Sequence, residues 1–504
     1  TPVMDLVANL VHGFTVALTP INVFLCLIGA LVGTLVGVLP GVGPVATIAM
    51  LLPITFGLPP VGALIMLAGI YYGAQYGGST TSILVNLPGE ASSVVTCLDG
   101  YQMARKGRAG AALSISAVGS FFAGTVGTII IVIFAEPLTR MAQKFGPADY
   151  CSLMALGLVA AVVLASGSVV KAIAMVFLGL LFGLVGTDVN TGAQRFTFDV
   201  PELSDGIDFA PIAMGLFGIA EIVVNLERRM SRSGAIKLTS LWPTREEMRR
   251  ATPAVLRGTA LGSILGVLPG GGPTLGAFSA YTLEKKISRN PGEFGKGAVE
   301  GVAAPEAANN AAAQTSFIPM LTLGIPSNAV MALMVGAMII QGIQPGPEVM
   351  TKKPDLFWGM IASMWIGNLM LVIINLPMIG MWVKLLTVPY RFLAPAILLF
   401  CCIGAYSLQN STFHVAQVAI FGVLGYIFVR LGCEGAPFLL GLVLGPQMEE
   451  YFRRAMLLSR GDPMVFIQRP ISLGLLIATA ILLVLMALPS IKKAREEAFQ
   501  EEDG

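Results

Sequence analysis

The stretch GVLPGVGP, residues Gly37–Pro44, ends an almost pure hydrocarbon segment with three glycines and two prolines. The stretch GVLPGGGP, residues Gly266–Pro273, repeats it with a single change. Backbone without intrahelical hydrogen bonds is tolerated at membrane depth only where it is buried in protein or lines a wet cavity. Either copy alone could be a tight loop at a membrane surface. Two matching copies predict discontinuous helices or re-entrant turns beside a polar site.

The composition of the chain around the two GVLP stretches is that of a membrane protein. Of the 504 residues, 55% are hydrophobic and 12% are charged, about half the charged share of a soluble domain. Continuous apolar stretches recur, and most approach or exceed the roughly 20 residues that cross a bilayer as a helix. They are Ile21–Leu39, Gly110–Ala135, Ser152–Ala165, Ala172–Val185, Phe357–Val383, Phe413–Val429 and Ile471–Leu488. We therefore expect an all-α polytopic membrane protein.

Several function classes find no support in the residues. The net charge of +2 gives no indication of a nucleic-acid partner. His12 and His414 are the two histidines, and neither lies in an HExxH motif. The sequence contains no GxSxG elbow and no phosphate-binding loop, so we expect neither an enzyme nor ATP hydrolysis by this chain. The six cysteines lack metal-ligand spacing and are predicted to be small buried residues, and no cofactor or metal is expected.

A second pair of matching features follows the two GVLP stretches. Tyr71–Val94 follows the first GVLP stretch, and Val302–Val330 follows the second. Each combines small residues, a Thr-Ser pair, a short apolar stretch and a proline flanked by small or polar groups, which indicates an internal duplication. The predicted organisation is a first membrane repeat (1–226), a basic linker (227–257), a second membrane repeat (258–490) and a charged tail (491–504).

The distribution of charge suggests how the repeats are oriented. The linker holds eight Lys or Arg against three acids, so the positive-inside rule places it in the cytoplasm. The basic loops Arg105–Arg108 and Lys285–Lys296 have uncharged or neutral counterparts in the other half. We therefore expect two inverted-topology repeats with discontinuous helices and re-entrant hairpins, as in secondary transporters; a parallel duplication is the alternative. Thr187–Asp208, with five acids and one Arg, is expected outside.

Hydroxyl and amide groups gather at the second pair of features, where the following helices would expose free N–H groups. Helix N-termini bind anions without a buried lysine, and neutral oxygens can hold Na⁺. The predicted substrate-binding residues are Ser79, Thr80, Thr81, Ser82, Asn86, Pro88, Gly89, Asn309, Asn310, Thr315, Ser316, Thr322, Pro326, Ser327 and Asn328. The loop residues expected near the site are Gly37, Pro40, Gly41, Gly43, Gly266, Pro269, Gly270, Gly271 and Gly272. The alternative is that these hydroxyls and amides serve helix packing.

The charges near this set are acidic. No Lys or Arg occurs between Tyr71 and Ser93 or between Gly297 and Val330, so we expect an anion held by helix N-termini and neutral side chains. The acids nearby could bind protons or cations, or could lie at helix ends in water; they are Glu90, Asp99, Glu300 and Glu306. We also expect Ser79–Ser82 to lie near Thr315–Ser316.

The stretches LDGYQMARKGRAG (Leu98–Gly110) and GVAAPEAANNA (Gly301–Ala311) are specific. Through them and over nearly its whole length, the chain resembles the large membrane subunit of the bacterial tripartite tricarboxylate transporter family. The resemblance implies secondary active import of an organic carboxylate across the inner membrane, with Na⁺ or H⁺ as the coupling ion. It also implies a small membrane subunit and a periplasmic substrate-binding protein as partners.

One departure bears on the substrate. Ser327-Asn328-Ala329-Val330 stands where citrate-type members of the family have a longer stretch rich in Gly, Ser and Thr. Dicarboxylates and monocarboxylates, including aromatic acids, therefore remain open beside tricarboxylates. An ion channel and a non-transporting membrane scaffold are the alternative functions.

Overall fold

The computed structural model describes residues 2–39, 43–165, 168–188, 190–227, 240–268, 272–385 and 390–487. The predictions made for Pro40, Gly41, Pro269, Gly270 and Gly271 lie outside the described residues. So do residues 228–239 of the predicted linker and the whole of the predicted tail.

The first half of the chain contains ten α-helices in its described part. They are α1 (Pro2–Ala17), α2 (Pro20–Val38), α3 (Pro44–Thr55), α4 (Pro60–Val85), α5 (Val94–Met103), α6 (Ala109–Ala142), α7 (Pro147–Leu164), α8 (Val169–Gly183), α9 (Phe209–Ala213) and α10 (Ala220–Glu227). Short 3₁₀ or π segments join or flank them: η1 (Ala91–Ser93), η2 (Ala104–Arg108), η3 (Pro201–Leu203) and η4 (Met214–Ile219). A two-stranded antiparallel ribbon, β1 (Gly186–Thr187) and β2 (Gln194–Arg195), pairs Gly186 with Arg195.

The second half continues with helices throughout its described part. They are α11 (Arg245–Val267), α12 (Pro273–Ile287), α13 (Glu300–Thr315), α14 (Phe317–Leu323), α15 (Ala329–Ile340), α16 (Glu348–Lys352), α17 (Pro354–Asn375), α18 (Ile379–Leu385), α19 (Tyr390–Gln409), α20 (Thr412–Arg430), α21 (Gly435–Leu458), α22 (Val465–Gln468) and α23 (Pro470–Ala487), with η5 (Pro291–Glu293) before α13. Helix α11 begins inside the range predicted as the linker.

Within the described ranges, five helical segments are long and apolar enough to cross a membrane. They are Pro20–Val38, Ala91–Ala142, Phe209–Glu227, Pro354–Asn375 and Thr412–Arg430. The prediction of an all-α polytopic membrane protein is confirmed, whereas the opposite orientation of the two halves stays a prediction. Of the six cysteines, Cys402 is an exception to the expected burial, because it is exposed on α19.

Helices α2 and α4 pack with their backbones in close contact. The glycines of α2 recur every fourth residue on the face toward α4, and a methyl group on any of them would lie within 3 Å of a carbonyl oxygen of α4. The pairs are Gly29 with Met66, Gly33 with Ile70 and Gly37 with Ala74. Small residues four apart allow this close approach between membrane helices.

Helices α11 and α13 repeat this arrangement in the second half. Here the pairs are Gly258 with Ala304, Gly262 with Ala308 and Gly266 with Ala312, again within 3 Å. In each half, therefore, the helix that precedes the GVLP loop packs through three glycines against a helix that follows it. The internal duplication seen in the sequence corresponds to a repeated packing unit.

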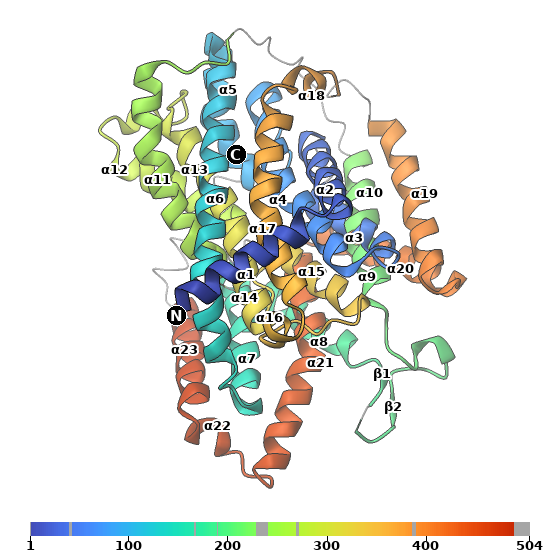
Figure 1. Ribbon diagram of the computed structural model, residues 1–504. Coiled ribbons are helices and arrows are strands. Elements are labelled where there is room, and N and C mark those ends of the chain that lie inside the picture. Colours follow the sequence, from blue (N-terminus) through green and yellow to red (C-terminus); the bar gives the residue numbers. More distant parts are fainter. Residues whose placement is uncertain are drawn as a thin grey trace.

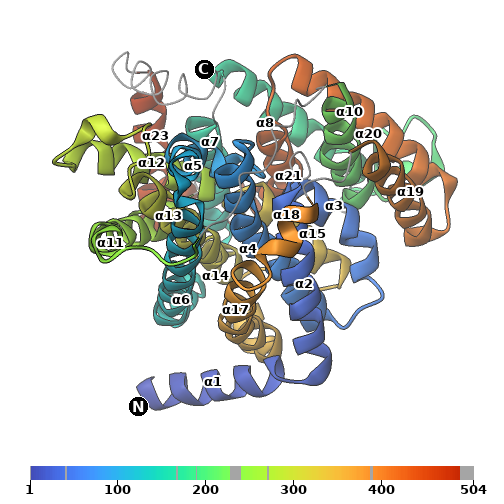
Figure 2. The same ribbon diagram turned by 90° about the horizontal axis from the view of Figure 1, so that it is seen from above.

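The second helix of each unit lies in the interior. Every residue from Gly62 to Val85 in α4 and from Gly301 to Thr315 in α13 is buried. Figure 1 shows α4, α6 and α17 near the centre of the molecule, with α11 and α12 on one side and α19 and α20 on the other. In the view from above, α1 lies along the outer edge (Figure 2). Since α4 and α13 are buried, their polar side chains need partners inside the protein.

Candidate functional site

The chain breaks in the same way in each half, at residues 86–90 after α4 (the first break) and at residues 324–328 after α14 (the second break). Asn86 follows α4 with φ 56°, and Gly324 follows α14 with φ 76°, so both residues are left-handed. Four residues later the backbone is fully extended, with φ −151° and ψ 169° at Glu90 and φ −154° and ψ 178° at Asn328. Asn and Gly are the residues that adopt the left-handed conformation most readily at a helix end. The two breaks therefore share their backbone conformation, and each begins with a residue type that favours it.

The second break is anchored to α4 by the side chain of Asn328. Its Oδ1 accepts from the N–H of Met331 at 3.0 Å and caps α15. Its Nδ2 lies 3.2 Å from the hydroxyl oxygen of Tyr71 on α4 and 3.1 Å from Oγ of Ser316. A residue of the second break thus contacts the central helix of the first half.

Glu306 on α13 is fully buried, with no exposed surface. Its carboxylate accepts hydrogen bonds from the hydroxyls of Ser79 on α4 and Thr96 on α5. It also accepts from Oγ of Ser116 on α6 at 3.2 Å and from Nδ2 of Asn309 at 3.5 Å. Among the described residues, no Lys, Arg or His forms an ion pair with it. Four neutral donors from four helices therefore hold one carboxylate.

Glu90 lies at the first break and is partly buried. Nε2 of Gln75 donates to its carboxylate at 2.8 Å, and the hydroxyl of Ser92 reaches it from the next turn. Oγ of Ser92 also lies 2.7 Å from Oε1 of Gln75. Glu90, too, has no basic partner in the described part of the chain. Both carboxylates of the site depend on neutral groups.

One face of α4 connects all of these groups. Tyr71, Gln75 and Ser79 are four residues apart, which places them on one face of the helix over about 12 Å. Tyr71 contacts Asn328, Gln75 contacts Glu90 and Ser79 contacts Glu306. We call these three residues the polar stripe of α4. It links both breaks and both carboxylates into one site.

The two central helices run antiparallel where they meet. Ser79 contacts Glu306, whereas the rings of Tyr71 and Phe317 lie 6.2 Å apart. Residues early in α4 therefore lie beside the end of α13, and residues late in α4 lie beside its first turns. As a result, Tyr71 is the residue of α4 beside Ser316, with Asn328 contacting both, whereas Ser79 contacts Glu306 and Ser82 contacts the carbonyl of Ser93.

The remaining hydroxyls predicted on α4 hold the first break in place. Oγ1 of Thr81 donates to the carbonyl of Val38 at 2.7 Å, at the end of α2. Oγ of Ser82 donates to the carbonyl of Ser93 at 2.9 Å. Thr80 is buried. In this conformation Thr81 and Ser82 therefore fix the loop on either side of the break.

The residues predicted on α13 to α15 divide between the site and helix packing. Asn310 donates to Oγ of Ser120 at 2.8 Å, and Ser327 is buried, with Oγ 3.5 Å from the carbonyl of Ser316. Thr315 and Thr322 donate to carbonyl oxygens of their own helices, as the packing alternative expects. Asn86 is exposed, Pro88 is half-buried, and Gly89 and Pro326 are buried.

Both GVLP loops reach the breaks through their described residues. A methyl group on Gly89 would collide with the carbonyl of Gly37, so the first break passes directly over the end of α2. Gly272 has φ 105°, and a methyl group there would lie 3.1 Å from Nδ2 of Asn328. The N–H of Gly43 donates to Glu221 at 3.3 Å. The loops and the proline breaks therefore form one region in each half.

The other two candidate acids have structural partners. Asp99 accepts from the N–H groups of Gly297 and Ala298 at 2.7 and 2.8 Å and from the hydroxyl of Tyr281 at 2.9 Å. Glu300 forms an ion pair with Arg250 at 2.8 Å. In the described ranges, no group of three or more His, Cys, Asp or Glu is placed to hold a metal ion. Glu90 and Glu306 are the acids that the site itself contains.

Comparison with known proteins gives the family. The model of the tripartite tricarboxylate transporter TctA family matches residues 23–440. The chain belongs to this family. The resemblance stated from the sequence is confirmed, and the TctA family is a family of transporters and not of enzymes.

Two curated relatives come from Agrobacterium vitis. One, described as an uncharacterized 52.8 kDa protein in the TAR-I ttuC' 3'region, is 59% identical over 501 residues, covering 99% of this chain and all of the relative. The other, an uncharacterized protein in the TAR-II ttuC' 3'region, is 61% identical over 242 residues, covering 48% of this chain and all of the relative. No solved structure matches.

Proposed function

We propose that the chain is the membrane permease subunit of a binding-protein-dependent secondary transporter. It imports an organic carboxylate, a tricarboxylate, dicarboxylate or related acid, by cation symport with alternating access. The observation that carries the proposal is the convergence of two matching helix breaks and two carboxylates on the polar stripe of α4. TctA family membership supports the tricarboxylate transporter class.

The repeated packing unit supports alternating access. Helices α4 and α13 are equivalent in the two units, and they run antiparallel where they touch. Equivalent helices of opposite direction are what an inverted-topology repeat requires. In such transporters, one repeat moves against the other around a site at their interface. The polar stripe of α4 lies at this interface.

The start of α15 supports an anion site without a basic clamp. Among the described residues, the N–H groups of Ala329 and Val330 have no hydrogen-bond acceptor, and Asn328 fixes this helix end beside Tyr71. A helix N-terminus carries about half a positive charge. Each charge-assisted hydrogen bond to a carboxylate contributes about 1.5–3 kcal/mol. Substrate is therefore held by the second break and by neighbouring hydroxyl and amide groups.

Glu306 and Glu90 supply the coupling site for Na⁺ or H⁺. A carboxylate kept from water without a compensating charge costs several kcal/mol. Neutral donors reduce this cost for Glu306, and a proton or a sodium ion removes the remaining charge. Because the bound anion and the cation compensate each other's charge, neither binds well alone, and their transport is coupled.

The two partners of a tripartite system complete the proposal. They are a small membrane subunit and a periplasmic substrate-binding protein, and the location is the bacterial inner membrane with the linker in the cytoplasm. The acidic segment Thr187–Asp208 exposes Asp199, Glu202 and Asp205. Its base is fixed by Arg453, which lies 3.1 Å from Asp188. An ordered acidic surface of this kind suits docking of the binding protein outside the membrane.

Counterflow tests the proposal. The chain is reconstituted in liposomes with its small membrane subunit, loaded with unlabelled carboxylate, and supplied with labelled carboxylate and the binding protein outside. A transporter gives transient accumulation of label by exchange. A channel equilibrates label without accumulation, and a scaffold gives no entry. Absence of counterflow for every carboxylate that the binding protein holds would contradict the proposed function.

A further inference from the structure

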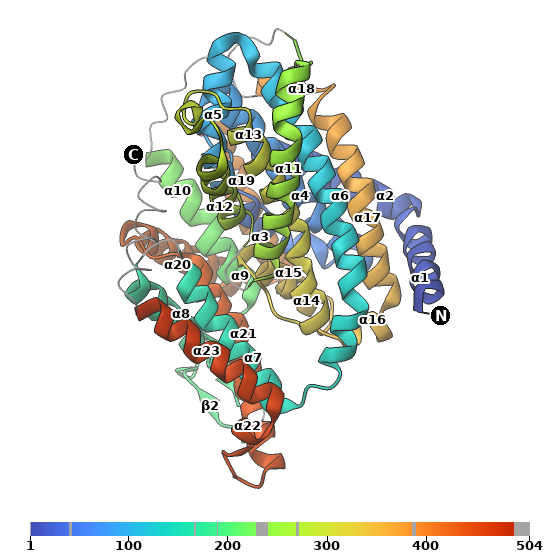
Figure 3. The same ribbon diagram turned by 90° about the vertical axis from the view of Figure 1, so that its left-hand side faces the viewer.

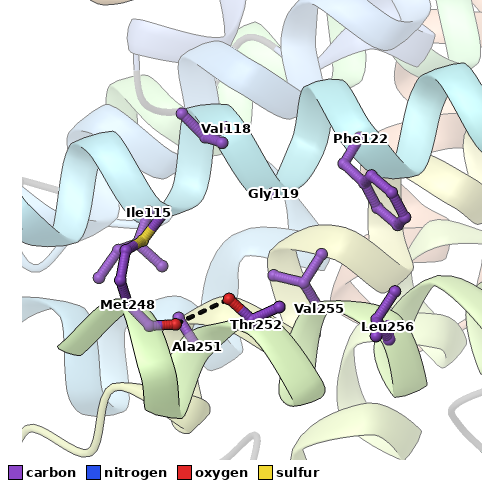
Figure 4. Close-up of a pocket in the computed structure, with 9 residues that line it drawn as sticks. All are labelled: Ile115, Val118, Gly119, Phe122, Met248, Ala251, Thr252, Val255 and Leu256. Carbon is purple, nitrogen blue, oxygen red and sulfur yellow. Dashed lines mark hydrogen bonds between the residues drawn. The ribbon is translucent and has the colours of Figure 1, made fainter. Parts of the chain in front are cut away.

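An apolar groove, lined by no residue of the polar stripe, lies between α6 and α11 (Figure 4). Figure 3 shows these two helices side by side. The volume of the groove is about 160 Å³, and it opens to the protein surface. Its lining is Ile115, Val118, Gly119 and Phe122 of α6 and Met248, Ala251, Thr252, Val255 and Leu256 of α11. The one hydroxyl in this lining, Oγ1 of Thr252, already donates to the carbonyl of Met248 at 2.8 Å. The groove therefore offers no free donor and suits a hydrocarbon chain.

Two arginines without partners stand at one end of the groove. Arg245 and Arg249 lie within one turn of Met248, and both are exposed. Neither has a carboxylate partner among the described residues. By contrast, Arg250 pairs with two glutamates and Arg257 pairs with Glu284 at 2.6 Å. This end of the groove therefore holds two arginines that form no ion pair within the described part of the chain.

Sequence and exposure place the same end at a membrane surface. Residues 228–239, which precede this end in the chain, contain three Arg, one Lys and no acid. Trp242 is 82% exposed, next to α11 in the chain. Exposed tryptophans and clusters of Lys and Arg are typical of membrane–water interfaces. Farther from this end of the groove, α6 exposes Val118, Phe122 and Ile129, as a lipid-facing helix would.

The size of the groove fits one lipid chain. Met248 and Leu256 are eight residues apart, which spans about 12 Å along a helix. One leaflet of a bilayer core is about 15 Å thick. Figure 4 shows Ile115 beside Met248 at one end and Phe122 above Leu256 toward the other. A chain lying in the groove would run from the interface into the hydrocarbon core.

We propose that this groove binds one acyl chain of an anionic phospholipid, with the phosphate held by Arg245 and Arg249. Basic clusters at the cytoplasmic ends of membrane helices recognise anionic headgroups. The charge at the end of the groove favours a lipid over an apolar helix of another protein, because a helix would leave both arginines unpaired. The site does not depend on the proposed transport function.

Native mass spectrometry of the purified full chain tests the proposal. The first binding constant is measured for phosphatidylglycerol and for phosphatidylcholine with the same acyl chains. We expect phosphatidylglycerol to bind about thirtyfold more tightly, because each of the two arginines contributes about fivefold. The double variant Arg245→Gln/Arg249→Gln should remove this preference. The matched control Lys286→Gln/Arg289→Gln, which removes two exposed charges at the end of α12, should retain it.

A second variant tests the groove itself. Thr252→Trp fills the space from an exposed position and should weaken binding of both lipids at least tenfold. Equal binding of the two lipids by the wild-type chain would overturn the proposal. So would a preference that survives the arginine variant, or lipid binding that is unchanged in Thr252→Trp. A photo-cross-linking residue at position 252 should capture phospholipid in membranes, and capture of a protein in its place would contradict the proposed occupant.

Discussion

Replacing Glu306 by Gln separates coupling from folding. The variant keeps the shape of the side chain and removes its charge. In the wild-type chain, Ser79, Ser116 and Asn309 donate to one carboxylate oxygen and Thr96 donates to the other. A Gln side chain with its carbonyl at the first position keeps three donors, and the hydroxyl oxygen of Thr96 can accept one N–H of the new amide.

The magnitudes favour a folded variant. Charge-assisted hydrogen bonds contribute about 1.5–3 kcal/mol and neutral ones about 0.5–1.5 kcal/mol. Losing the charge at three bonds therefore costs about 3–5 kcal/mol of stabilisation. The desolvation cost of a buried carboxylate is also several kcal/mol, and it disappears in the variant. Because the two changes nearly cancel, the free energy of unfolding should change by less than about 2 kcal/mol.

Transport should change far more. One coupled cation with a tenfold gradient supports up to about tenfold accumulation of substrate, since each tenfold ratio corresponds to about 1.4 kcal/mol. Glu306→Gln should lower the accumulation ratio to about one, while counterflow at equal cation concentrations persists. The control Glu300→Gln also removes a negative charge from α13, but that charge pairs with Arg250. The control variant should therefore accumulate substrate normally. Gradient-driven accumulation by Glu306→Gln at the wild-type level would refute the role of Glu306.

Three further predictions concern packing, the second break and topology. Gly33→Val should destabilise the chain by about 1–3 kcal/mol in thermal unfolding, because its Cβ would lie 2.6 Å from the carbonyl oxygen of Ile70. The control Gly380→Val should have little effect, because the space around its Cβ is open. Asn328→Ala should weaken substrate uptake and cation dependence together and leave membrane expression intact, and normal uptake would refute its role. Thr191→Cys should react with an impermeant maleimide in intact spheroplasts; labelling only after lysis would refute the external location.

Much of the fold follows from the sequence because its signals are local. Continuous apolar runs predict membrane helices, and the repeated GVLP stretch marks a duplication that the packing of α2 on α4 and of α11 on α13 reproduces. The helix breaks at Pro88 and Pro326 are predictable for the same reason. Left-handed Asn86 and Gly324 precede them, and these residue types favour that conformation.

The site was harder to predict because its partners come from distant helices. Tyr71, Gln75, Thr96 and Ser116 are neutral residues within apolar helices, and no break marks them. The spacing of four between Tyr71, Gln75 and Ser79 was the available signal for the stripe. The neighbours of Ser79 depend on α4 and α13 running antiparallel, which is a property of tertiary packing. Local sequence therefore indicates the polar residues but not their pairing.

Cation-coupled import of a carboxylate is tested most directly by measuring the fluxes of carboxylate and cation at the same time. Proteoliposomes containing the chain and its small membrane subunit receive binding protein and labelled carboxylate, while entry of ²²Na⁺ and internal pH are recorded together. We expect one cation species to enter with the carboxylate in a fixed ratio, and substrate to accumulate above its external concentration until that cation gradient is abolished. Carboxylate entry that stops at equal concentrations, with neither ion moving, would contradict it.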